Sequence, residues 1–306
     1  MALRLGTRSS QLAILQSEEI HKALEARGRS SELVMIKTES EGPVTRPAGA
    51  MVGRFTHALE QALLKNEIDL AVHSLKDLPT ESHPQLMVPV VTRRLPCEDV
   101  LISKTGMRLA QLPSGAKVGT SSPRRQAQIL TLRQDLRIVP LHGNVDTRLK
   151  KLRETDLDAI VLARAGLMRL GRESEAMEIL PLEKMLPAPG QGSLAVQIRK
   201  SDTHTMEAVL FLDDDESRRT TSSEREFLQA LGGGCQIPVG AWARIDRGRL
   251  ILTGSLISLD GKVVIRDEVQ EPVEDSKPLG RTLAKRFLDR GAKTLVEEWR
   301  RQLEER

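Results

Sequence analysis

Two similar stretches, GTRSSQLA at residues 6–13 and GTSSPRRQA at residues 119–127, each lie between a strand-like run and a helix-like run. Both place a Gly-Thr pair, serines and arginines at the start of the helix, which is a weak internal duplication. Hydroxyls, guanidinium groups and free backbone N–H donors at the positive end of a helix dipole form a general site for carboxylates or phosphates. One such turn means little, because Ser and Thr are also ordinary N-caps. Two turns in matching places predict two lobes that share a cleft.

The segments around these turns alternate between strand-like and helix-like, as in α/β proteins with largely parallel sheets. Around the first turn, the spacing of apolar residues predicts strands at 3–6, 32–38 and 68–73 and helices at 10–26 and 55–63. Around the second turn it predicts strands at 117–119, 137–141 and 159–163 and helices at 123–132, 147–154 and 166–170. The Gly- and Pro-rich loop 41–53 is either a lid or a solvated connector.

The pattern changes from about residue 213 onward. A long helix at 216–231 is followed by three strand-like runs, at 239–245, 250–258 and 262–269, and by two more helices. Such an order predicts an α+β unit with an antiparallel sheet. The 306 residues are enough for two or three domains of roughly 100 residues each.

The overall composition is that of a globular protein, with 39% hydrophobic and 29% charged residues. No apolar run approaches the ~20 residues that a membrane span needs, and the N-terminus has no pattern of an export signal. We therefore expect a cytoplasmic protein that does not act in a membrane. The two cysteines, Cys97 and Cys235, lack the spacing of a disulfide framework, a redox pair or a zinc site, and the six histidines lack metal-ligand spacing.

The net charge of +4 and the pI near 9.2 fit an anionic partner. Nucleic acid is a poor candidate, because the chain has no Tyr, four Phe and two Trp on which bases could stack. It also lacks helix-turn-helix and zinc-finger patterns. Small polyanions fit the charge better, so we expect no nucleic-acid partner.

One thiol stands in an unusual setting, at the end of the glycine run in GGGCQIP, residues 232–238. Three successive glycines let the backbone adopt positive φ and let a bulky group approach closely, so Cys235 is presented for covalent chemistry. The ordinary alternative is a buried cysteine after a helix C-cap glycine. Three glycines exceed what a cap requires, which favours the functional interpretation.

Basic residues gather near predicted strand ends and helix starts. Pro123 at the first helical position holds Arg124 and Arg125 near the start of their helix, and a guanidinium fork can bind a carboxylate through two hydrogen bonds. In LHGNVDTR, residues 141–148, a strand, a glycine turn and a capped helix place Arg148 in a similar anion-binding geometry. Together these positions predict a cleft that binds polycarboxylates.

A single carboxylate, Asp77, follows a buried strand and is fixed by Pro79. Its ordinary role would be a helix or turn cap. A functional role needs a cation that develops nearby: at about 4 Å and an effective dielectric constant of ~20, a carboxylate stabilises such a cation by about 4 kcal/mol. The motifs of P-loop proteins, serine hydrolases and zinc peptidases are missing, which disfavours those classes.

Five motifs, in this order along the chain, closely resemble those of the porphobilinogen deaminase family, also called hydroxymethylbilane synthases: VHSLKDLP (72–79), GTSSPRRQ (119–126), GNVDTRL (143–149), LPAPGQG (186–192) and GGCQ (233–236). The resemblance runs through essentially the whole chain. It implies an enzyme that joins four porphobilinogen molecules head to tail, releases ammonia at each step and frees a linear tetrapyrrole. It further implies a dipyrromethane cofactor, attached by a thioether to Cys235, that primes the chain and is retained.

The resemblance also implies the architecture. The family has two periplasmic-binding-protein-like lobes with the active cleft between them, and a small α+β C-terminal domain with an antiparallel sheet that carries the cysteine. In this sequence the first domain would comprise residues 1–92 and 193–212, the second 97–190 and the third 213–306. A monomer is the implied state.

The resemblance implies a role for each matching residue. Asp77 would be catalytic, stabilising the azafulvenium cation that forms when ammonia leaves. Cofactor contacts would be Ser74, Lys76, Asp77, Thr120, Ser122, Arg124, Arg125, Asn144, Arg148 and Gln191. Substrate contacts would be Arg8, Ser10, Gln16, His142, Arg148 and Arg169, and no metal is implied.

Two positions depart from the family pattern. His142 stands where an arginine is usual, and it is cationic only part of the time near neutral pH. The lid loop lacks the usual lysine and offers Arg54 nearby instead. Two other classes remain open from the residues alone: a non-catalytic bilobed receptor for small carboxylates, and a nucleic-acid binder that rests on pI alone. A receptor would need no covalent group on Cys235.

Overall fold

The computed structural model describes residues 2–37, 54–232, 237–275 and 279–304. Its contacts divide the chain into two compact units. The first unit comprises residues 1–95 and 192–219, and the second comprises residues 96–191 and 220–305. The predicted lid loop 41–53 and Cys235 with its neighbouring glycines lie outside the described residues.

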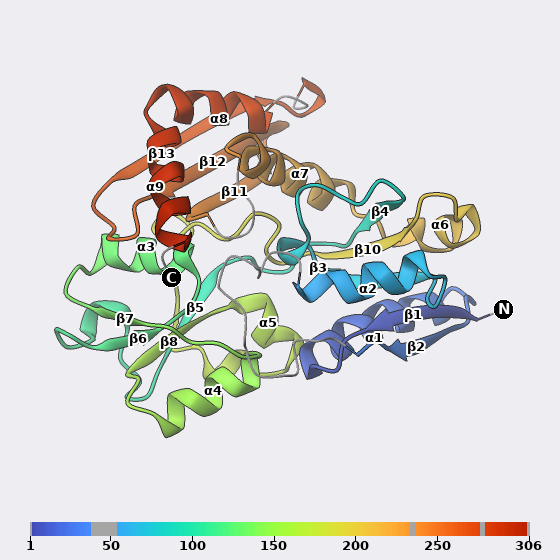
Figure 1. The fold of residues 1–306 in the computed structure, drawn as a ribbon, viewed down its shortest axis with the longest axis horizontal. Coiled ribbons are helices and arrows are strands. Elements are labelled where there is room, and N and C mark those ends of the chain that lie inside the picture. The colour runs from blue at the N-terminus through green and yellow to red at the C-terminus, as the bar shows by residue number, and fades with distance from the viewer. Residues whose placement is uncertain (1, 38–53, 233–236, 276–278, 305–306) are drawn as a thin grey trace. The chain divides into compact units, whose positions relative to one another are not determined.

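The first unit is built on a five-stranded sheet of order β2-β1-β3-β10-β4 (Figure 1). Its strands are β1 (Leu3–Thr7), β2 (Ser31–Met35), β3 (Leu70–Ser74), β4 (Leu86–Val91) and β10 (Leu194–Arg199). The pairs β1–β2 and β1–β3 are parallel, whereas β10 runs antiparallel to both β3 and β4. Its helices are α1 (Gln11–Glu25), α2 (Arg54–Leu64), η3 (Leu75–Asp77), α6 (Thr203–Val209) and η6 (Leu210–Leu212).

Both faces of this sheet are covered by helices. Leu70 and Val72 of β3 belong to a core cluster with Ile20 and Leu24 of α1. Ala71, which points to the opposite face because side chains alternate along a strand, belongs to a second cluster with residues of α2. Burial on two faces explains why β3 is apolar without a break until His73.

The second unit contains a five-stranded sheet of order β7-β6-β8-β5-β9. Its strands are β5 (Asp99–Ser103), β6 (Lys117–Gly119), β7 (Arg137–Val139), β8 (Ala159–Ala163) and β9 (Glu178–Ile179). Strand β6 pairs in parallel with β7 and β8, and β5 runs antiparallel to β8 and β9. The helices are η4 (Leu109–Gln111), α3 (Pro123–Leu132), α4 (Val145–Glu154), α5 (Arg164–Arg169) and η5 (Glu173–Glu175).

The two sheets share one plan, which confirms the two-lobed α/β fold predicted from the repeated turns. In each, three parallel strands are followed by a fourth that runs antiparallel to both of its neighbours. The prediction of largely parallel sheets is confirmed, because four of the five strands in each sheet run in the same direction. The strand of opposite direction, β10 in one sheet and β5 in the other, lies outside the alternating pattern on which the prediction rested.

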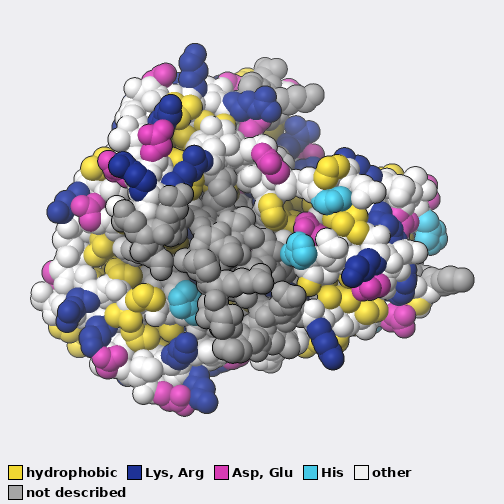
Figure 2. Space-filling model, in the orientation of Figure 1, with side chains coloured by type: hydrophobic (Ala, Val, Ile, Leu, Met, Phe, Trp, Pro, Cys, Tyr) yellow, Lys and Arg dark blue, Asp and Glu magenta, His cyan; other side chains and the backbone are white. Residues whose placement is uncertain are grey.

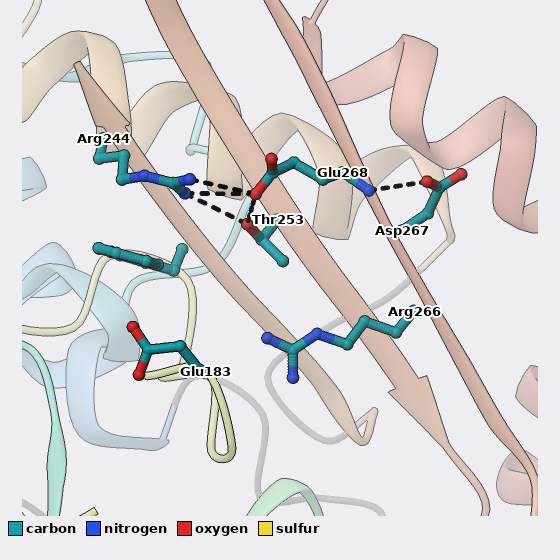
Figure 3. Close-up of a pocket in the computed structure, with 7 residues that line it drawn as sticks. Glu183, Arg244, Thr253, Arg266, Asp267 and Glu268 are labelled. Carbon is teal, nitrogen blue, oxygen red and sulfur yellow. Dashed lines mark hydrogen bonds and ion pairs between the residues drawn. The ribbon is translucent and has the colours of Figure 1, made fainter. Parts of the chain in front are cut away.

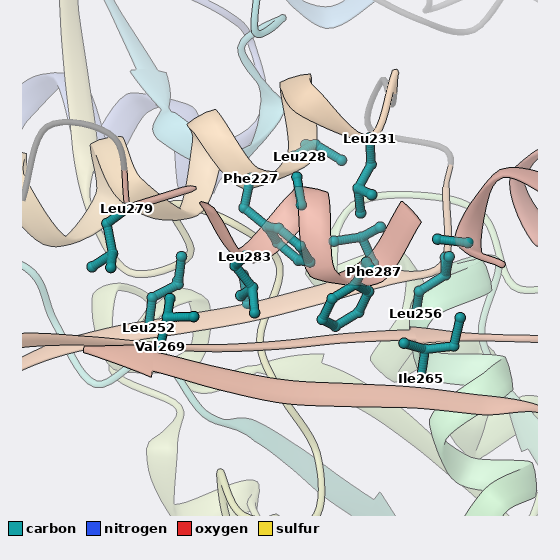
Figure 4. Close-up of a cluster of buried hydrophobic side chains, with 14 of the residues drawn as sticks. Phe227, Leu228, Leu231, Leu252, Leu256, Ile265, Val269, Leu279, Leu283 and Phe287 are labelled. Carbon is teal, nitrogen blue, oxygen red and sulfur yellow. The ribbon is translucent and has the colours of Figure 1, made fainter. Parts of the chain in front are cut away.

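The second unit also contains the predicted α+β part. Strands β11 (Val239–Asp246), β12 (Arg249–Ile257) and β13 (Val264–Pro272) form an antiparallel sheet. Val239, Ala241 and Ala243, at alternate positions of β11, point into a buried core. The rings of Phe227 and Phe287 pack edge to face in this core, with their centroids 4.9 Å apart (Figure 4). The helices are α7 (Asp215–Ala230), whose residues up to 219 belong to the first unit, α8 (Leu279–Asp289) and α9 (Ala292–Glu304), with η7 at Val273–Asp275.

The surface carries charges of both signs. On the face shown in Figure 2, Lys and Arg side chains are interspersed with Asp and Glu side chains. Among the helices that the structure describes, none is long and apolar enough to cross a membrane. Within the same residues, no group of His, Cys, Asp and Glu side chains is arranged to hold a metal ion.

Candidate active site

In the first unit, the predicted site residues follow the carboxyl ends of two neighbouring parallel strands. Strand β1 ends at Thr7, directly before Arg8, and β3 ends at Ser74 and continues into η3, which contains Lys76 and Asp77. Because β1 and β3 pair in parallel, their ends lie at the same edge of the sheet. Ligands of α/β sheets bind outside this edge.

A hydrogen bond joins helix α1 to this group. Gln16, which is buried on α1, donates from Nε2 to Ser74 Oγ at 2.9 Å. Ser10 is the N-cap of the same helix, and its hydroxyl accepts from the Ala13 backbone N–H at 3.3 Å. Gln16 thus belongs to the group, whereas the Ser10 hydroxyl has the ordinary capping role that its position also allowed.

Arg8 and Asp77 interact electrostatically. Burial lowers the pKa of the Arg8 guanidinium, and the negative charge of Asp77 partly offsets this effect. An arginine with little water around it and a carboxylate thus lie near enough to attract each other beyond the end of the sheet. This is the pair that the sequence predicted as a substrate contact and a catalytic group.

His73 is a neutral group directly behind this site. It is 5% exposed, and burial, together with the charge of Arg8, lowers its pKa to about 3. Protonation of His73 would place a second cation beside Arg8 in a poorly solvated environment. No role was predicted for His73, although its position on a strand that is buried up to Ser74 is a signal that it would be uncharged.

In the second unit, three parallel strands end beside the next group of predicted residues. Ser122 caps α3 after β6, with its hydroxyl accepting from the Arg125 N–H at 3.5 Å, and Asn144 caps α4 after β7, with its side chain accepting from the Thr147 N–H at 2.8 Å. The hydroxyl of the buried Thr120 accepts from the Ser122 N–H at 3.1 Å. These three oxygens therefore all hold backbone at helix starts.

A serine ties the two turns together. Ser121 Oγ accepts a hydrogen bond from the Leu141 N–H at 2.8 Å and lies 3.2 Å from His142 Nε2. The structure therefore brings the predicted residues after β6 and β7 into one group. Arg148 Nε donates to the Gly143 carbonyl at 2.8 Å, which fixes this arginine over the glycine turn. Arg169 is the last residue of α5 and is half-buried.

Arg124 and Arg125 share one buried carboxylate. Asp99 Oδ2 lies 2.7 Å from Arg124 Nη2, and Asp99 Oδ1 accepts from Arg125 Nη2 at 2.7 Å. Arg124 also donates to the Leu186 carbonyl at 2.6 Å, and Arg125 donates to the Val161 carbonyl at 3.0 Å. Burial and the neighbouring Arg125 lower the pKa of Arg124, while the charge of Asp99 raises it. Two cations facing one anion leave this cluster with an excess positive charge.

Gln191 completes the buried cluster. It is 1% exposed, and its Nε2 donates to the Cys97 carbonyl at 2.7 Å and to Asp99 Oδ1 at 3.0 Å. Its amide donors are thus directed at strand β5 and at the carboxylate that holds the arginines. Sequence reasoning missed Asp99, although an acidic residue that opens an otherwise apolar, fully buried strand signals a buried cation partner.

Comparisons with known proteins cover nearly the whole chain. The family profile described as "Porphobilinogen deaminase, dipyromethane cofactor binding domain" matches residues 3–207, and "Porphobilinogen deaminase, C-terminal domain" matches residues 219–289. A porphobilinogen deaminase of Pelobacter propionicus is 41% identical over 97% of this chain and 96% of its own. The porphobilinogen deaminase of Nocardia farcinica is 44% identical over 97% of this chain and 88% of its own.

Solved structures give a more distant likeness. A nutrient-binding protein of Burkholderia cenocepacia, bound to methionine, is 12% identical, covers 68% of this chain and 90% of its own, and has a TM-score of 0.40. A likeness at this level carries no argument about fold or function. The two family profiles and the relatives, by contrast, match nearly the whole chain, and the relatives do so at more than 40% identity. The chain therefore belongs to the porphobilinogen deaminase family, an enzyme family with a dipyrromethane cofactor binding domain.

Proposed function

We propose that this protein condenses four porphobilinogen molecules head to tail into hydroxymethylbilane, with release of ammonia at each step, in tetrapyrrole biosynthesis. The observation that carries the proposal is the match of both family profiles along the chain, joined by relatives that are 41–44% identical over almost their full length. The Arg8–Asp77 pair and the buried arginine cluster support it. Each would serve a substrate that carries carboxylates and becomes cationic.

The residues of the second unit fit a dipyrromethane, whose two pyrrole rings each carry an acetate and a propionate. The cluster of Arg124, Arg125 and Asp99 has an excess positive charge, and such a charge is costly in a buried place unless an anion opposes it. Arg125 Nε is buried and has no hydrogen-bond partner among the residues that the structure describes. A carboxylate of the cofactor would supply both the charge and the acceptor.

We propose that Cys235 holds this cofactor through a thioether and that basic and hydroxyl side chains bind its carboxylates. Arg124, Arg125 and Arg148 would provide guanidinium donors, and Lys76 would provide an ammonium. The Ser122 hydroxyl accepts from a backbone N–H and can still donate its own proton, and the same holds for Thr120. Ser74, which accepts from Gln16, can donate in the same way.

Asn144 would contact a carboxylate directly, whereas Gln191 would act through Asp99. The Asn144 side-chain oxygen fixes the start of α4, so that its amide N–H2 is what is left to face a carboxylate. Gln191 holds Asp99, which in turn orients both arginines. We therefore propose Gln191 as a positioning residue for the cluster.

Asp77 would be the catalytic residue. When bound, the cofactor supplies the free pyrrole α-carbon from which the chain is extended. When ammonia leaves the porphobilinogen aminomethyl group with the electrons of the C–N bond, the ring left behind is cationic. The Asp77 carboxylate would stabilise this cation and accept a proton at its oxygen. The positive charge of Arg8 attracts this carboxylate.

Substrate carboxylates would be held by Arg8, Arg148 and Arg169, with polar contacts from Ser10, Gln16 and His142. His142 is exposed and its Nε2 lies 3.2 Å from Ser121 Oγ, so this polar contact would stand where the family pattern has an arginine.

We further propose three domains, at 1–92 with 193–212, 97–190 and 213–306. Each part has a sheet of its own, and separate buried clusters support the division of the second unit. We also propose that the protein works as a cytoplasmic monomer without a nucleic-acid partner.

The experiment that tests the function is an assay of the purified chain with porphobilinogen. We expect ammonia to be released in proportion to the substrate consumed and hydroxymethylbilane to be found as the product. The Cys235→Ser variant is the matched control, since it should fold and show neither. Absence of ammonia and of a linear tetrapyrrole from the unaltered chain would contradict the proposal.

A further inference from the structure

A pocket of about 390 Å³ lies on the three-stranded sheet of the second unit (Figure 3). Trp242 and Arg244 alternate with the buried core residues of β11, so they point to the face of the sheet opposite the core. Their cross-strand neighbours on that face are Thr253 and, next to it, Glu268. The proposed catalytic and cofactor groups include none of these residues.

Most charges in this pocket have partners within the protein. Arg244 Nη2 lies 3.3 Å from Glu268 Oε2, and this oxygen also accepts from the Thr253 hydroxyl at 2.6 Å (Figure 3). Asp267 Oδ2 lies 3.7 Å from Arg286 Nη1 and 3.9 Å from Arg290 Nη1. These contacts neutralise three of the charged side chains that line the pocket.

The other two charged side chains that line the pocket are Arg266 and Glu183. Arg266 is half-buried and lies on β13, and Glu183 is exposed and lies between β9 and β10. They attract each other electrostatically, but neither side chain makes a hydrogen bond or an ion pair within 4.0 Å in the part of the chain that the structure describes. Figure 3 shows both side chains at the pocket, extending from different elements.

Trp242 adds an aromatic surface. Its ring lines the pocket, and the guanidinium carbon of Arg244 lies 4.6 Å from the ring centroid, which fixes the arginine and the indole against each other. A flat ring packs well against an indole that is held in this way. The pocket therefore offers one cation, one anion and one aromatic contact to a single ligand.

We propose that this pocket binds a small zwitterion with a flat ring, whose carboxylate contacts Arg266, whose ammonium contacts Glu183 and whose ring lies against Trp242. Two kinds of molecule have this chemistry. One is porphobilinogen, an aminomethyl pyrrole with two carboxylates, in which case the inference rests on the proposed function. The other is a free aromatic amino acid.

Tryptophan fluorescence tests the proposal, because the chain has two tryptophans and the other one, Trp299, is buried. In the Trp299→Phe variant, emission comes from Trp242 alone. We expect 4-(aminomethyl)benzoate to change this emission in a saturable way. Benzoate and benzylamine, which each carry one of the two charges, should bind several-fold more weakly. Calorimetric titration of the unaltered chain gives the same comparison without the Trp299 substitution.

Substitution identifies the site. Arg266→Gln should weaken the binding of 4-(aminomethyl)benzoate about tenfold, because a charge-assisted hydrogen bond is lost. Glu183→Gln should weaken it less, since Glu183 is exposed. Arg249→Gln, at an exposed arginine of the same sheet, is the matched control and should change nothing. No binding up to about 10 mM ligand, or binding that Arg266→Gln leaves unaltered, would overturn the proposal.

The source of the ligand is decided in the Cys235→Ser background, where turnover cannot begin. Tighter binding of porphobilinogen than of L-phenylalanine would support the substrate as the occupant, and the reverse order would support an amino acid. If neither binds in a way that depends on Arg266, the proposal is wrong. The titration with 4-(aminomethyl)benzoate does not depend on the enzyme's reaction. A negative result there can therefore be told apart from failure of the proposed function.

Discussion

Asp99 Oδ1 accepts a hydrogen bond of 2.7 Å from Arg125 Nη2, and both side chains are almost fully buried. The other oxygen of Asp99 lies 2.7 Å from Arg124 Nη2. One carboxylate therefore holds two guanidinium groups in place at the start of α3. The orientation of both arginines toward any bound carboxylate depends on this single acid.

The Asp99→Asn substitution should destabilise the protein by about 3 kcal/mol, because it leaves two buried cations without an opposing charge. Urea titration followed by circular dichroism measures the loss. Asp135→Asn, at the exposed ion pair with Arg133, is the control and should leave the midpoint of unfolding nearly unchanged. Equal midpoints for the two variants would show that Asp99 does not neutralise the cluster.

Asp77→Asn should keep the fold and lower the rate of porphobilinogen consumption at least about a hundredfold, because a neutral amide cannot stabilise a cationic ring. Steady-state ammonia release at saturating substrate measures the rate. Glu81→Gln, at an exposed carboxylate four residues further along, should retain ordinary turnover. A variant at position 77 with ordinary turnover would remove Asp77 from the catalytic role.

His73 predicts a dependence of stability on pH. Its pKa is lowered to about 3 in the folded protein by burial and by Arg8, whereas the ordinary value is 6.5. Between these values the unfolded chain binds a proton that the folded chain does not, so the free energy of unfolding falls as the pH falls below about 6.5. Above this pH the contribution of His73 is constant.

The His73→Gln variant isolates this effect. Between about pH 7 and pH 5, the unaltered chain should lose about 2 kcal/mol more of its free energy of unfolding than the variant does. Urea titration at the two pH values measures both losses, and the subtraction removes the other titrating groups. Equal losses of the free energy of unfolding in the two proteins would mean that His73 binds a proton in the folded state as readily as in the unfolded state.

Glu224 connects the segment before Gln191 to the three-stranded sheet. It is fully buried, and its two carboxylate oxygens accept from the Gly190 N–H at 2.8 Å and from the Ala243 N–H at 2.7 Å. Glu224→Gln turns an N–H2 toward one of these donors and should lower stability by about 1–3 kcal/mol. Glu226→Gln, at a less buried carboxylate that accepts one backbone bond, should cost less when measured by the same urea titration. The opposite order would contradict this role for Glu224.

Much of the fold could be predicted from the sequence, because the signals are local. Helix α3 begins and ends where Pro123 and the apolar spacing predicted, and β6 and β8 have the predicted bounds. Strands β10 and β5, which are fourth in the order of their sheets, could not be placed from local signals. Strand β10 joins β3 across more than a hundred residues of chain, and such a pairing leaves no periodic signal in the surrounding sequence.

The candidate site was predictable in its residue types and less so in its contacts. Gly-Thr turns and arginines at helix starts could be found from the sequence, and the structure places them at strand ends as expected. The burial of Arg124 and Arg125 against Asp99 could not be predicted, because Asp99 is on a strand that the local pattern did not reveal. Whether Ser10 and Asn144 cap helices or contact ligand likewise depends on tertiary geometry.

The intact mass of the purified chain tests the central claim most directly. The account predicts a mass above that of the 306 residues by two porphobilinogen units less two ammonia molecules, and no such increment in the Cys235→Ser variant. A mass equal to that of the residues alone, in a preparation that had been supplied with porphobilinogen, would contradict the account.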